Sequence, residues 1–140
     1  MYSQKALERY ESDLRVGSLP RDACDVGSSQ VRSAQHGDVI RIQIRITEDG
    51  GVIEAARFKA FGCGWTIASA SLAAEWLEGK TTGEALDIRA HQIATELELP
   101  EDKRQCATLA TDAIRGAVED YQAKRRLAPP IAPRTPDLAM

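Results

Sequence analysis

The sequence has no hydrophobic run of membrane-spanning length and no excess of positive charge. None of its apolar runs approaches the roughly 20 residues of a transmembrane helix. A formal net charge of −3 argues against nucleic acid as the main partner. A helical pattern begins directly after Met1, so we expect no signal or transit segment. These absences predict a protein of the bacterial cytoplasm with neither nucleic acid nor a membrane as partner.

Cysteine is scarce, with Cys24, Cys63 and Cys106 as the only three. An odd number of thiols in a chain without an export signal favours metal or redox chemistry over a disulfide framework. The length of 140 residues predicts one domain, long enough to bury a sizeable core. With 43% hydrophobic and 28% charged residues, the composition is ordinary for a globular protein.

The segment 58–71, FKAFGCGWTIASAS, is the most informative part of the chain. Cys63 stands between Gly62 and Gly64, where a predicted strand ends and a helix begins. The glycines leave room around the sulfur and tolerate positive φ, and the helix N-terminus stabilises a thiolate. Such a thiolate can bind a metal or attack sulfur. A tight turn with a buried thiol is an equally good interpretation of these residues alone.

Two strands are predicted on either side of a turn at 48–51, which contains the hairpin signal Asp49-Gly50. Residues 39–46 alternate cleanly, with isoleucines on one face and Arg41, Gln43 and Arg45 on the other. Residues 52–61 return antiparallel. This pairing brings Asp38, at the start of one strand, close to Cys63, at the end of the other.

The remaining pattern is mostly helical. We expect a short amphipathic helix at 2–14, at most one short strand within 15–37, a helix ended by Gly79, a short helix capped by Thr82, a helix at 91–97, and a long helix at 102–126. The tail 127–140 holds four of the six prolines and is expected to be disordered. The order predicts an α+β domain over 1–126, with helices packed on one face of a small antiparallel sheet.

Several short motifs occur in a characteristic order along most of the chain. They are Tyr2-Ser3, Val16-Gly17-Ser18, Val26-Gly27-Ser28, Gly37-Asp38, Phe58-Lys59, Gly62-Cys63-Gly64, Ile67-Ala68-Ser69 and Glu96-Leu97-Glu98-Leu99-Pro100. With these motifs the chain resembles the iron–sulfur cluster assembly scaffolds of the IscU/NifU type, from Tyr2 to about Lys124.

The resemblance implies a three-stranded sheet packed against several helices, with an often mobile N-terminal segment at 1–22. It also implies a scaffold, not an enzyme, on which a transient [2Fe–2S] cluster is built and passed to acceptor apo-proteins. A cysteine desulfurase would deliver persulfide sulfur to Cys106, chosen by its position in the motif. The implied ligands are His36, Asp38, Cys63 and Cys106, and the same set suits Zn²⁺ in a purified form.

The sequence departs from the family pattern at four places. His36 stands where the first cysteine is expected, and Gln105 replaces the histidine before the last cysteine. Glu101-Asp102 replaces Pro-Val in the chaperone-recognition stretch, which predicts weak or absent binding to an Hsp70-type chaperone. Trp65 replaces a small residue, and it either covers the site or packs against the N-terminal segment. An imidazole in place of a thiolate makes a bound cluster less negative, so it should raise the cluster potential.

Two other functions stay open at this point. A zinc-dependent sulfur-transfer protein would keep zinc bound and move only sulfur, although its usual insertion is not evident between Cys63 and Cys106. A non-assembling paralogue would bind the desulfurase as a regulator or adaptor without building a cluster. The missing first cysteine favours this function. Cys24 and His91 are expected to be surface residues rather than ligands, and Gln105 a neutral neighbour or a hydrogen-bond donor to a ligand.

Overall fold

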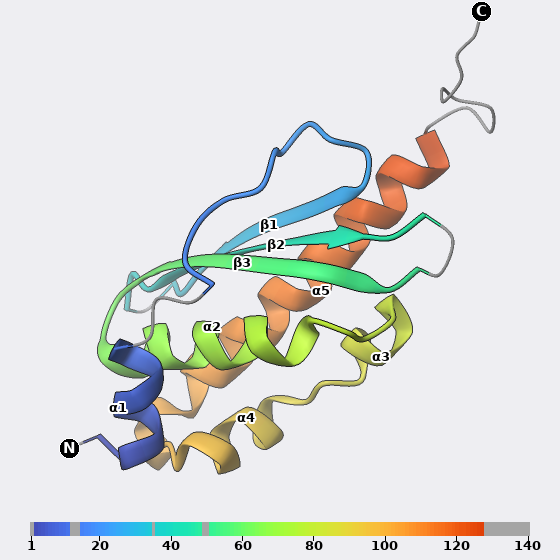
Figure 1. The fold of residues 1–140 in the computed structure, drawn as a ribbon. Helices are drawn as coiled ribbons and strands as arrows, with labels where there is room; N and C mark the ends of the chain where they lie inside the picture. The colour runs from blue at the N-terminus through green and yellow to red at the C-terminus, as the bar shows by residue number, and fades with distance from the viewer. Residues whose placement is uncertain (1, 12–14, 35, 49–50, 128–140) are drawn as a thin grey trace, which may run out of the picture.

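The computed structural model describes residues 2–11, 15–34, 36–48 and 51–127, and shows one antiparallel sheet with helices against one of its faces (Figure 1). The strand order is β1-β2-β3. The elements are α1 (Gln4–Glu11), β1 (Val26–Arg32), β2 (Val39–Ile46), β3 (Ile53–Phe61), α2 (Gly64–Leu77), α3 (Thr82–Leu86), α4 (Ala90–Leu97), the 3₁₀ turn Glu101–Lys103 and α5 (Arg104–Leu127). The predicted α+β class and three-stranded sheet are confirmed.

The alternating strand β2 supplies the centre of the core. Its isoleucines at 40, 42, 44 and 46 are at most 2% exposed. The strand pairs with β3 in a register that sets Val39 opposite Phe61 and Ile42 opposite Phe58. Because β2 and β3 run in opposite directions, the start of β2 and the end of β3 meet at one end of the sheet. This end carries Asp38 and Cys63.

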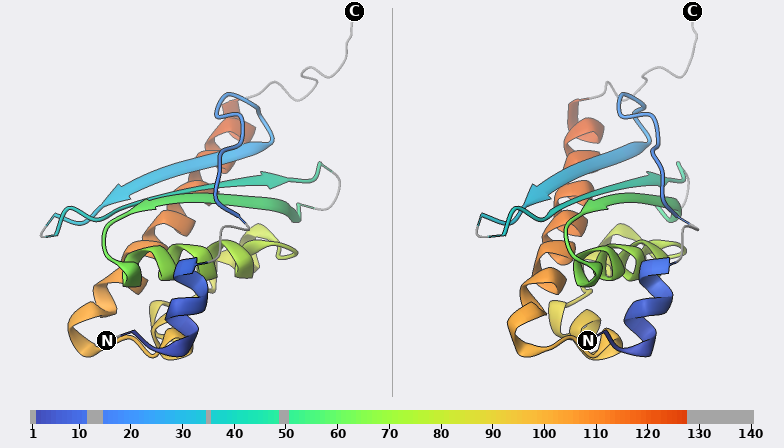
Figure 2. Two further views of the ribbon diagram at one scale, coloured as in Figure 1. Left: turned by 60° about the vertical axis from the view of Figure 1, so that its left-hand side comes forward. Right: turned by 90° about the vertical axis from the view of Figure 1, so that its left-hand side faces the viewer.

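Helix α2 packs against β3 beside α5 and separates the sheet from α1 and α4 (Figure 2). It is buried on nearly every side, because β3 covers one face while α1, α4 and α5 contact the others. Small side chains such as Ala68, Ala70, Ala73 and Ala74, all fully buried, let these elements approach closely. A helix enclosed in this way presents a fixed N-terminus to the end of the sheet. None of the helices in the described residues is long and apolar enough to cross a membrane.

Strand β1 lies directly on the long helix α5. A Cβ atom at Gly27 would collide with the carbonyl oxygen of Ala117 and would come within 2.9 Å of the Cβ of Tyr121. The amide of Ser28 donates a 2.9 Å hydrogen bond to Asp120. Only a glycine permits this backbone approach, so α5 is held at a fixed position under β1.

The opposite face of the sheet is covered in part by the segment that leads from α1 into β1 (Figure 2). Gln43 lies beneath this segment and is only 2% exposed. Its amide accepts a 2.8 Å hydrogen bond from the Leu19 amide and donates 2.9 Å bonds to the Leu19 carbonyl and the Ser28 hydroxyl. The sequence predicted Gln43 on the polar face of a half-buried strand, whereas its amide is buried and fully used.

Several predicted boundaries differ from the observed ones. The stretch 15–37 contains a strand of seven residues, and the short helix α3 is capped by Thr81 rather than Thr82. Thr81 and Glu84 form a reciprocal capping box, which the sequence analysis missed. The long helix begins two residues later than predicted, after a 3₁₀ turn. The expected disorder of the tail concerns residues that, apart from Leu127, lie outside the described part, as does the predicted turn centre at 49–50.

The N-terminal helix is docked against the body of the domain. Ser3 caps it by accepting a 3.1 Å hydrogen bond from the Ala6 amide, and its hydroxyl donates to the Leu97 carbonyl. Ala6 is fully buried against α2. The helix ends at Glu11, earlier than the predicted 14, and residues 12–14 lie outside the described part. The expected mobility of 1–22 therefore stays a prediction, and the structure shows its docked form.

Candidate functional site

Cys63 occupies the position that the sequence analysis gave it, between the end of β3 and the start of α2. It is the N-cap residue of α2, with extended backbone angles, and its carbonyl accepts hydrogen bonds from the Thr66 and Ile67 amides. Gly62, with φ +150, makes the sharp change of direction before it. The Cys63 side chain is partly exposed, so its sulfur lies within reach of a partner protein.

A single hydroxyl group joins the two cysteines. Thr66 is fully buried, and its Oγ1 lies 3.5 Å from the sulfur of Cys63 and 3.4 Å from that of Cys106. The two sulfurs can therefore be no farther apart than these two distances combined. Cys106, on the first turn of α5, is 1% exposed. The convergence of Cys106 on Cys63, which rested on family resemblance alone, is present in the structure.

Asp38 borders the same pair of thiols. The residue is 7% exposed, and its carboxylate lies against Gly62, where any Cβ atom would strike Oδ1. A Cβ atom at Gly62 would also come within 3.1 Å of Thr66 Oγ1. Gly62 thus leaves the space that lets a carboxylate approach the thiol pair. The antiparallel pairing of β2 with β3 accounts for this position, as the sequence predicted.

The two thiols differ in acidity. Burial acts to raise the pKa of Cys63, but hydrogen bonds from the Thr66 hydroxyl and from the Thr66 and Trp65 amides, with the charge of Lys103, outweigh it and lower the pKa overall. Burial raises the pKa of Cys106 to about 11, and the negative charges of Cys63 and Asp38 act in the same direction. Of these two thiols, the partly exposed Cys63 is therefore the more acidic.

His36 lies in the turn between β1 and β2, and its side chain is exposed. Its amide donates a 3.2 Å hydrogen bond to Ser33, and Gly37, with φ +74, separates it from Asp38. Within the described residues, no three His, Cys, Asp or Glu side chains come close enough together to hold a metal ion. The four-ligand set therefore stays a prediction, with Asp38, Cys63 and Cys106 gathered around Thr66 and His36 at the surface.

Trp65 packs against the N-terminal segment. Its ring centroid lies 4.7 Å from that of Tyr2, with the planes inclined at 50°, and the residue is 5% exposed. The Tyr2 hydroxyl accepts a 3.1 Å hydrogen bond from the Gly64 amide. Of the two interpretations of Trp65, packing against the N-terminal segment is the observed one. The contact also ties Tyr2 to the residue that follows Cys63.

The other candidates lie where the sequence analysis expected them. Cys24 is exposed and precedes β1, whose first residue pairs with Arg45, so Cys24 belongs to the opposite end of the sheet from Cys63. His91 is exposed on the first turn of α4. Gln105 is half-buried beside Cys106.

An apolar groove is lined by residues of β3 and α2 that flank Cys63 in the sequence. Its volume is about 340 Å³, and it is lined by Val16, Phe58, Lys59, Ala60, Phe61 and Ile67. Phe61 is 66% exposed and Val16 is 48% exposed, the two most exposed large hydrophobic side chains among the described residues. Phe61 stands two residues before Cys63 and Ile67 four residues after it, so the groove is close to this thiol along the chain.

Thr66 is the site residue that the sequence analysis missed. A signal for it was present, because Thr66 follows the N-cap Cys63 by three residues. This is the spacing of a capping box, in which each side chain bonds to the backbone amide of the other residue, so that both side chains lie at the start of the helix. A hydroxyl residue at N3 should therefore have been expected beside the Cys63 sulfur.

The difference in acidity predicts the order in which the thiols react. In the metal-free protein at about pH 8, iodoacetamide should label Cys63 well before Cys106, because a lowered pKa populates the thiolate earlier and a pKa of about 11 keeps the buried thiol neutral. Peptide mass spectrometry after timed quenching measures both rates. In Thr66→Val, which removes the hydroxyl at nearly constant volume, the labelling of Cys63 should slow. Equal rates for the two cysteines would contradict this account.

Comparisons with known proteins agree with this architecture. Residues 1–128 match the family model described as the NifU-like N-terminal domain. The iron–sulfur cluster assembly scaffold protein IscU of Haemophilus influenzae is 48% identical over 124 residues, covering 89% of this chain and 98% of that protein. IscU of Azotobacter vinelandii is 48% identical over 126 residues, covering 90% and 98%.

A solved structure shares the fold at low sequence identity. The N-terminal part of a nitrogen-fixing NifU-like protein from Brucella abortus superposes with a TM-score of 0.67 at 18% identity, covering 87% of this chain and 94% of that one. Fold, motif order and sequence identity agree over nearly the same residues. The chain therefore belongs to the NifU-like N-terminal domain family, as a relative of the IscU scaffold proteins.

Proposed function

We propose that this protein is a scaffold on which a [2Fe–2S] cluster is assembled and then passed to acceptor apo-proteins. The observation that carries the proposal is the convergence of a partly exposed thiol and a buried thiol on one hydroxyl at the end of the sheet. Thiolates are the usual ligands of such clusters. The IscU relatives named as cluster assembly scaffolds support the same function. The reducing cytoplasm is the compartment that would keep both thiols free.

In this proposal, Cys63, Cys106 and Asp38 bind the cluster, and His36 completes the set. The cluster is cargo, so its ligands must release it as well as hold it. A carboxylate such as Asp38 exchanges more easily than a thiolate, and a histidine at the surface can move away from the other ligands. The same four residues suit Zn²⁺, which would occupy the site when iron and sulfide are absent.

Sulfur would reach the site from a cysteine desulfurase. A thiolate of the scaffold attacks the outer sulfur of the persulfide on the desulfurase, a new S–S bond forms, and the thiolate of the desulfurase leaves. The position of Cys106 in the family motif favours it as the acceptor, whereas exposure and acidity favour Cys63. Intact-mass and peptide analysis after one turnover of desulfurase with Cys63→Ser and Cys106→Ser distinguishes the two.

The apolar groove whose residues flank Cys63 in the sequence supports docking of the desulfurase near this thiol. Phe61 and Val16 offer exposed apolar area, and Phe61 stands two residues before Cys63. Exposed apolar patches of this kind mark interaction surfaces. The transferred sulfur, once reduced to sulfide by an external two-electron donor, enters the cluster and leaves with it. The protein thus acts as a scaffold and not as an enzyme.

The exposed position of His36 favours one other function, that of an adaptor which binds the desulfurase without building a cluster. Iron and acid-labile sulfide measured after anaerobic reconstitution separate the alternatives. Equal amounts of iron and sulfide, with about two of each per cluster, support the scaffold. Zinc without sulfide supports a zinc-dependent sulfur-transfer protein. Neither metal nor sulfide supports the adaptor and contradicts the proposal.

Binding of a dedicated Hsp70-type chaperone is expected to be weak or absent. Glu101 and Asp102 are both exposed on the 3₁₀ turn that follows Pro100. A groove that accepts apolar residues at these two positions would have to desolvate two carboxylates, at a cost of several kcal/mol if they stay unpaired. Fluorescence anisotropy of a labelled 98–105 peptide measures the affinity. Micromolar or tighter binding would contradict the expectation, and a peptide carrying Pro-Val at 101–102 is the matched positive control.

A further inference from the structure

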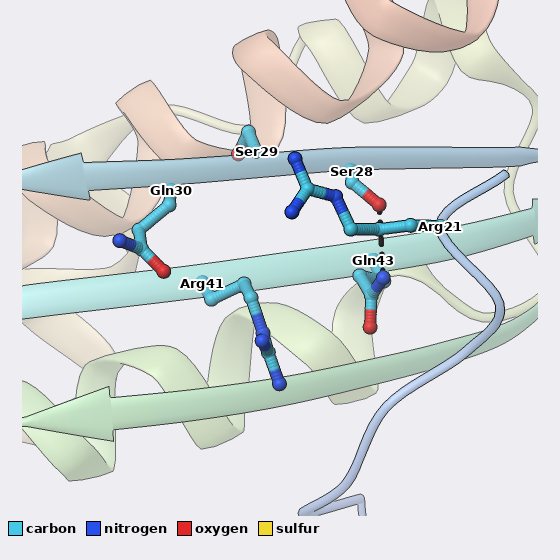
Figure 3. A pocket seen from close by; sticks show the side chains of 6 residues that line it. All are labelled: Arg21, Ser28, Ser29, Gln30, Arg41 and Gln43. Atoms are coloured by element: carbon cyan, nitrogen blue, oxygen red, sulfur yellow. Dashed lines mark hydrogen bonds between the residues drawn. The ribbon is translucent and has the colours of Figure 1, made fainter.

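A second pocket lies on the face of the sheet that is turned away from the helices (Figure 3). Its volume is about 220 Å³, and it is lined by Arg21, Ser28, Ser29, Gln30, Arg41 and Gln43. The strand register sets Ser28 opposite Gln43 and Gln30 opposite Arg41, so these four side chains share one face. From the segment before β1, Arg21 reaches over Ser28, whereas Arg41 points toward β3 and Ser18 (Figure 3). The thiols lie at the end of the sheet and take no part in this pocket.

The pocket is rich in hydrogen-bond donors and poor in free acceptors. Among the described residues, neither Arg21 nor Arg41 forms an ion pair with a carboxylate. The Nε atom of Arg41 is buried and has no hydrogen-bond partner, although Nη2 donates to Ser18 over 2.6 Å. A buried donor without a partner is costly, and two unpaired guanidinium groups add a strong positive field. Such a site favours an acceptor with negative charge.

The neutral groups of the pocket cannot supply that acceptor. The Gln43 oxygen is already bonded to the Leu19 amide, and its nitrogen donates to the Leu19 carbonyl and the Ser28 hydroxyl. Gln30 is exposed and can turn either end of its amide inward. Among the described residues, no carboxylate supplies this acceptor, which leaves the pocket open to an anionic ligand.

The segment that carries Arg21 is held on both sides of the residue. Gln43 fixes Leu19 through two hydrogen bonds. From α5, Lys124 Nζ donates to the Arg21 carbonyl over 2.6 Å and to the Val26 carbonyl over 2.7 Å. A backbone fixed in this way limits the entropy that Arg21 loses when it binds a ligand. The backbone that carries Arg21 is therefore held in place, while its exposed side chain settles on the ligand.

We propose that this pocket binds a small multivalent oxyanion of the phosphate class. Guanidinium groups bind such anions through paired N–H···O bonds, and Arg21 and Arg41 offer two of these groups from different elements. The volume lies below the roughly 300–1,000 Å³ of pockets for drug-sized ligands. It suits inorganic phosphate, pyrophosphate or a short phosphomonoester, and it is too small for a nucleotide. The chain carries a net charge of −3, so this attraction is local to the pocket.

The test is a titration of the full chain with sodium phosphate, pyrophosphate and citrate, followed by ¹H–¹⁵N NMR at an ionic strength held constant with sodium chloride. We expect saturable shifts of the Ser28, Gln30 and Gln43 amides with both phosphates, and tighter binding of pyrophosphate. Absence of saturable shifts with either phosphate overturns the proposal. Saturable binding of citrate without binding of either phosphate also overturns it, because the site would then select carboxylates.

Two charge-removing variants and a matched control locate the binding. Arg21→Gln and Arg41→Gln should each weaken binding by about tenfold, as expected for the loss of a charge-assisted pair. Arg115→Gln removes the same charge from an exposed position on α5 and should change the affinity by less than about twofold. Equal losses in all three variants would mean that net charge alone is responsible, and would refute the site. Arg41→Lys, which keeps the charge without the planar fork, replaces Arg41→Gln if that variant does not fold.

Discussion

Replacing His36 with cysteine is expected to lower the midpoint potential of a bound [2Fe–2S] cluster by on the order of 100 mV. A thiolate in place of a neutral imidazole adds about one negative charge to the cluster, and the added charge disfavours reduction. The pH dependence of assembly should change as well, because imidazole and thiol lose their protons in different pH ranges. Redox titration of both proteins after anaerobic reconstitution, repeated at several pH values, measures both effects.

The position of His36 makes this variant informative. The side chain is exposed, and Gly37, with φ +74 and no atom within 4 Å of the place where a Cβ would be, leaves the turn free to adjust. A cysteine side chain is shorter than a histidine, and this freedom lets the turn move so that a cysteine at 36 reaches the cluster. His91→Cys, which adds a thiol at an exposed position on α4, is the matched control and should leave the potential unchanged. An unchanged potential and pH profile in His36→Cys would show that His36 is not a ligand, and the adaptor function would then be favoured.

Replacing Gly27 with alanine should destabilise the fold strongly, by about 3 kcal/mol or more. The new Cβ would collide with the Ala117 carbonyl oxygen and come within 2.9 Å of the Tyr121 Cβ. Both belong to α5, and a backbone carbonyl in a helix cannot rotate away. Strand β1 would have to move off α5 and strain the hydrogen bond between Ser28 and Asp120. Thermal unfolding followed by circular dichroism should show a fall in Tm on the order of 10 °C.

A second glycine supplies the control for this substitution. In α3, a Cβ at Gly83 would have its nearest neighbour at 3.9 Å, an ordinary van der Waals contact. Gly83→Ala should therefore leave stability unchanged or raise it by up to about 1 kcal/mol, since alanine is the better helix former. Similar Tm values for the two variants would show that β1 does not approach α5 as closely as described.

Local patterns predicted much of the fold. The isoleucines at 40, 42, 44 and 46 alternate with polar residues, and all four are buried in β2. The hairpin register followed from this strand and its turn, and it placed Asp38 beside Cys63 correctly. These features depend on neighbours in sequence, so periodicity and turn chemistry were enough to predict them.

Features that depend on tertiary contacts were not accessible in the same way. Gln43 belongs to the polar alternation of β2, but the segment around Leu19 covers it and uses its amide. The arrival of Cys106 at Cys63 depends on how α5 packs against α2 and β1, which no local pattern specifies. Resemblance to a family supplied that placement before the structure did. Thr66 was missed although its spacing from Cys63 was informative, because a threonine in a helix was treated as ordinary sequence.

The pocket around Arg21 and Arg41 combines one residue that local sequence places with one that only tertiary contacts place. The alternation of β2 predicted that Arg41 faces away from the isoleucines. That Arg21 joins it depends on Lys124, near the end of α5, holding the Arg21 carbonyl. These two residues are separated by more than a hundred positions in sequence, and only the packed structure brings them together.

The most direct test of the proposed function is transfer of the cluster to another protein. The reconstituted chain is mixed anaerobically with an apo-ferredoxin, and the visible circular dichroism of the two proteins follows the cluster. We predict that the ferredoxin gains its cluster within minutes, and that Asp38→Ala, which removes the exchangeable carboxylate, retains the cluster longer. A cluster that forms but stays on the chain would contradict the scaffold and indicate a resident cofactor.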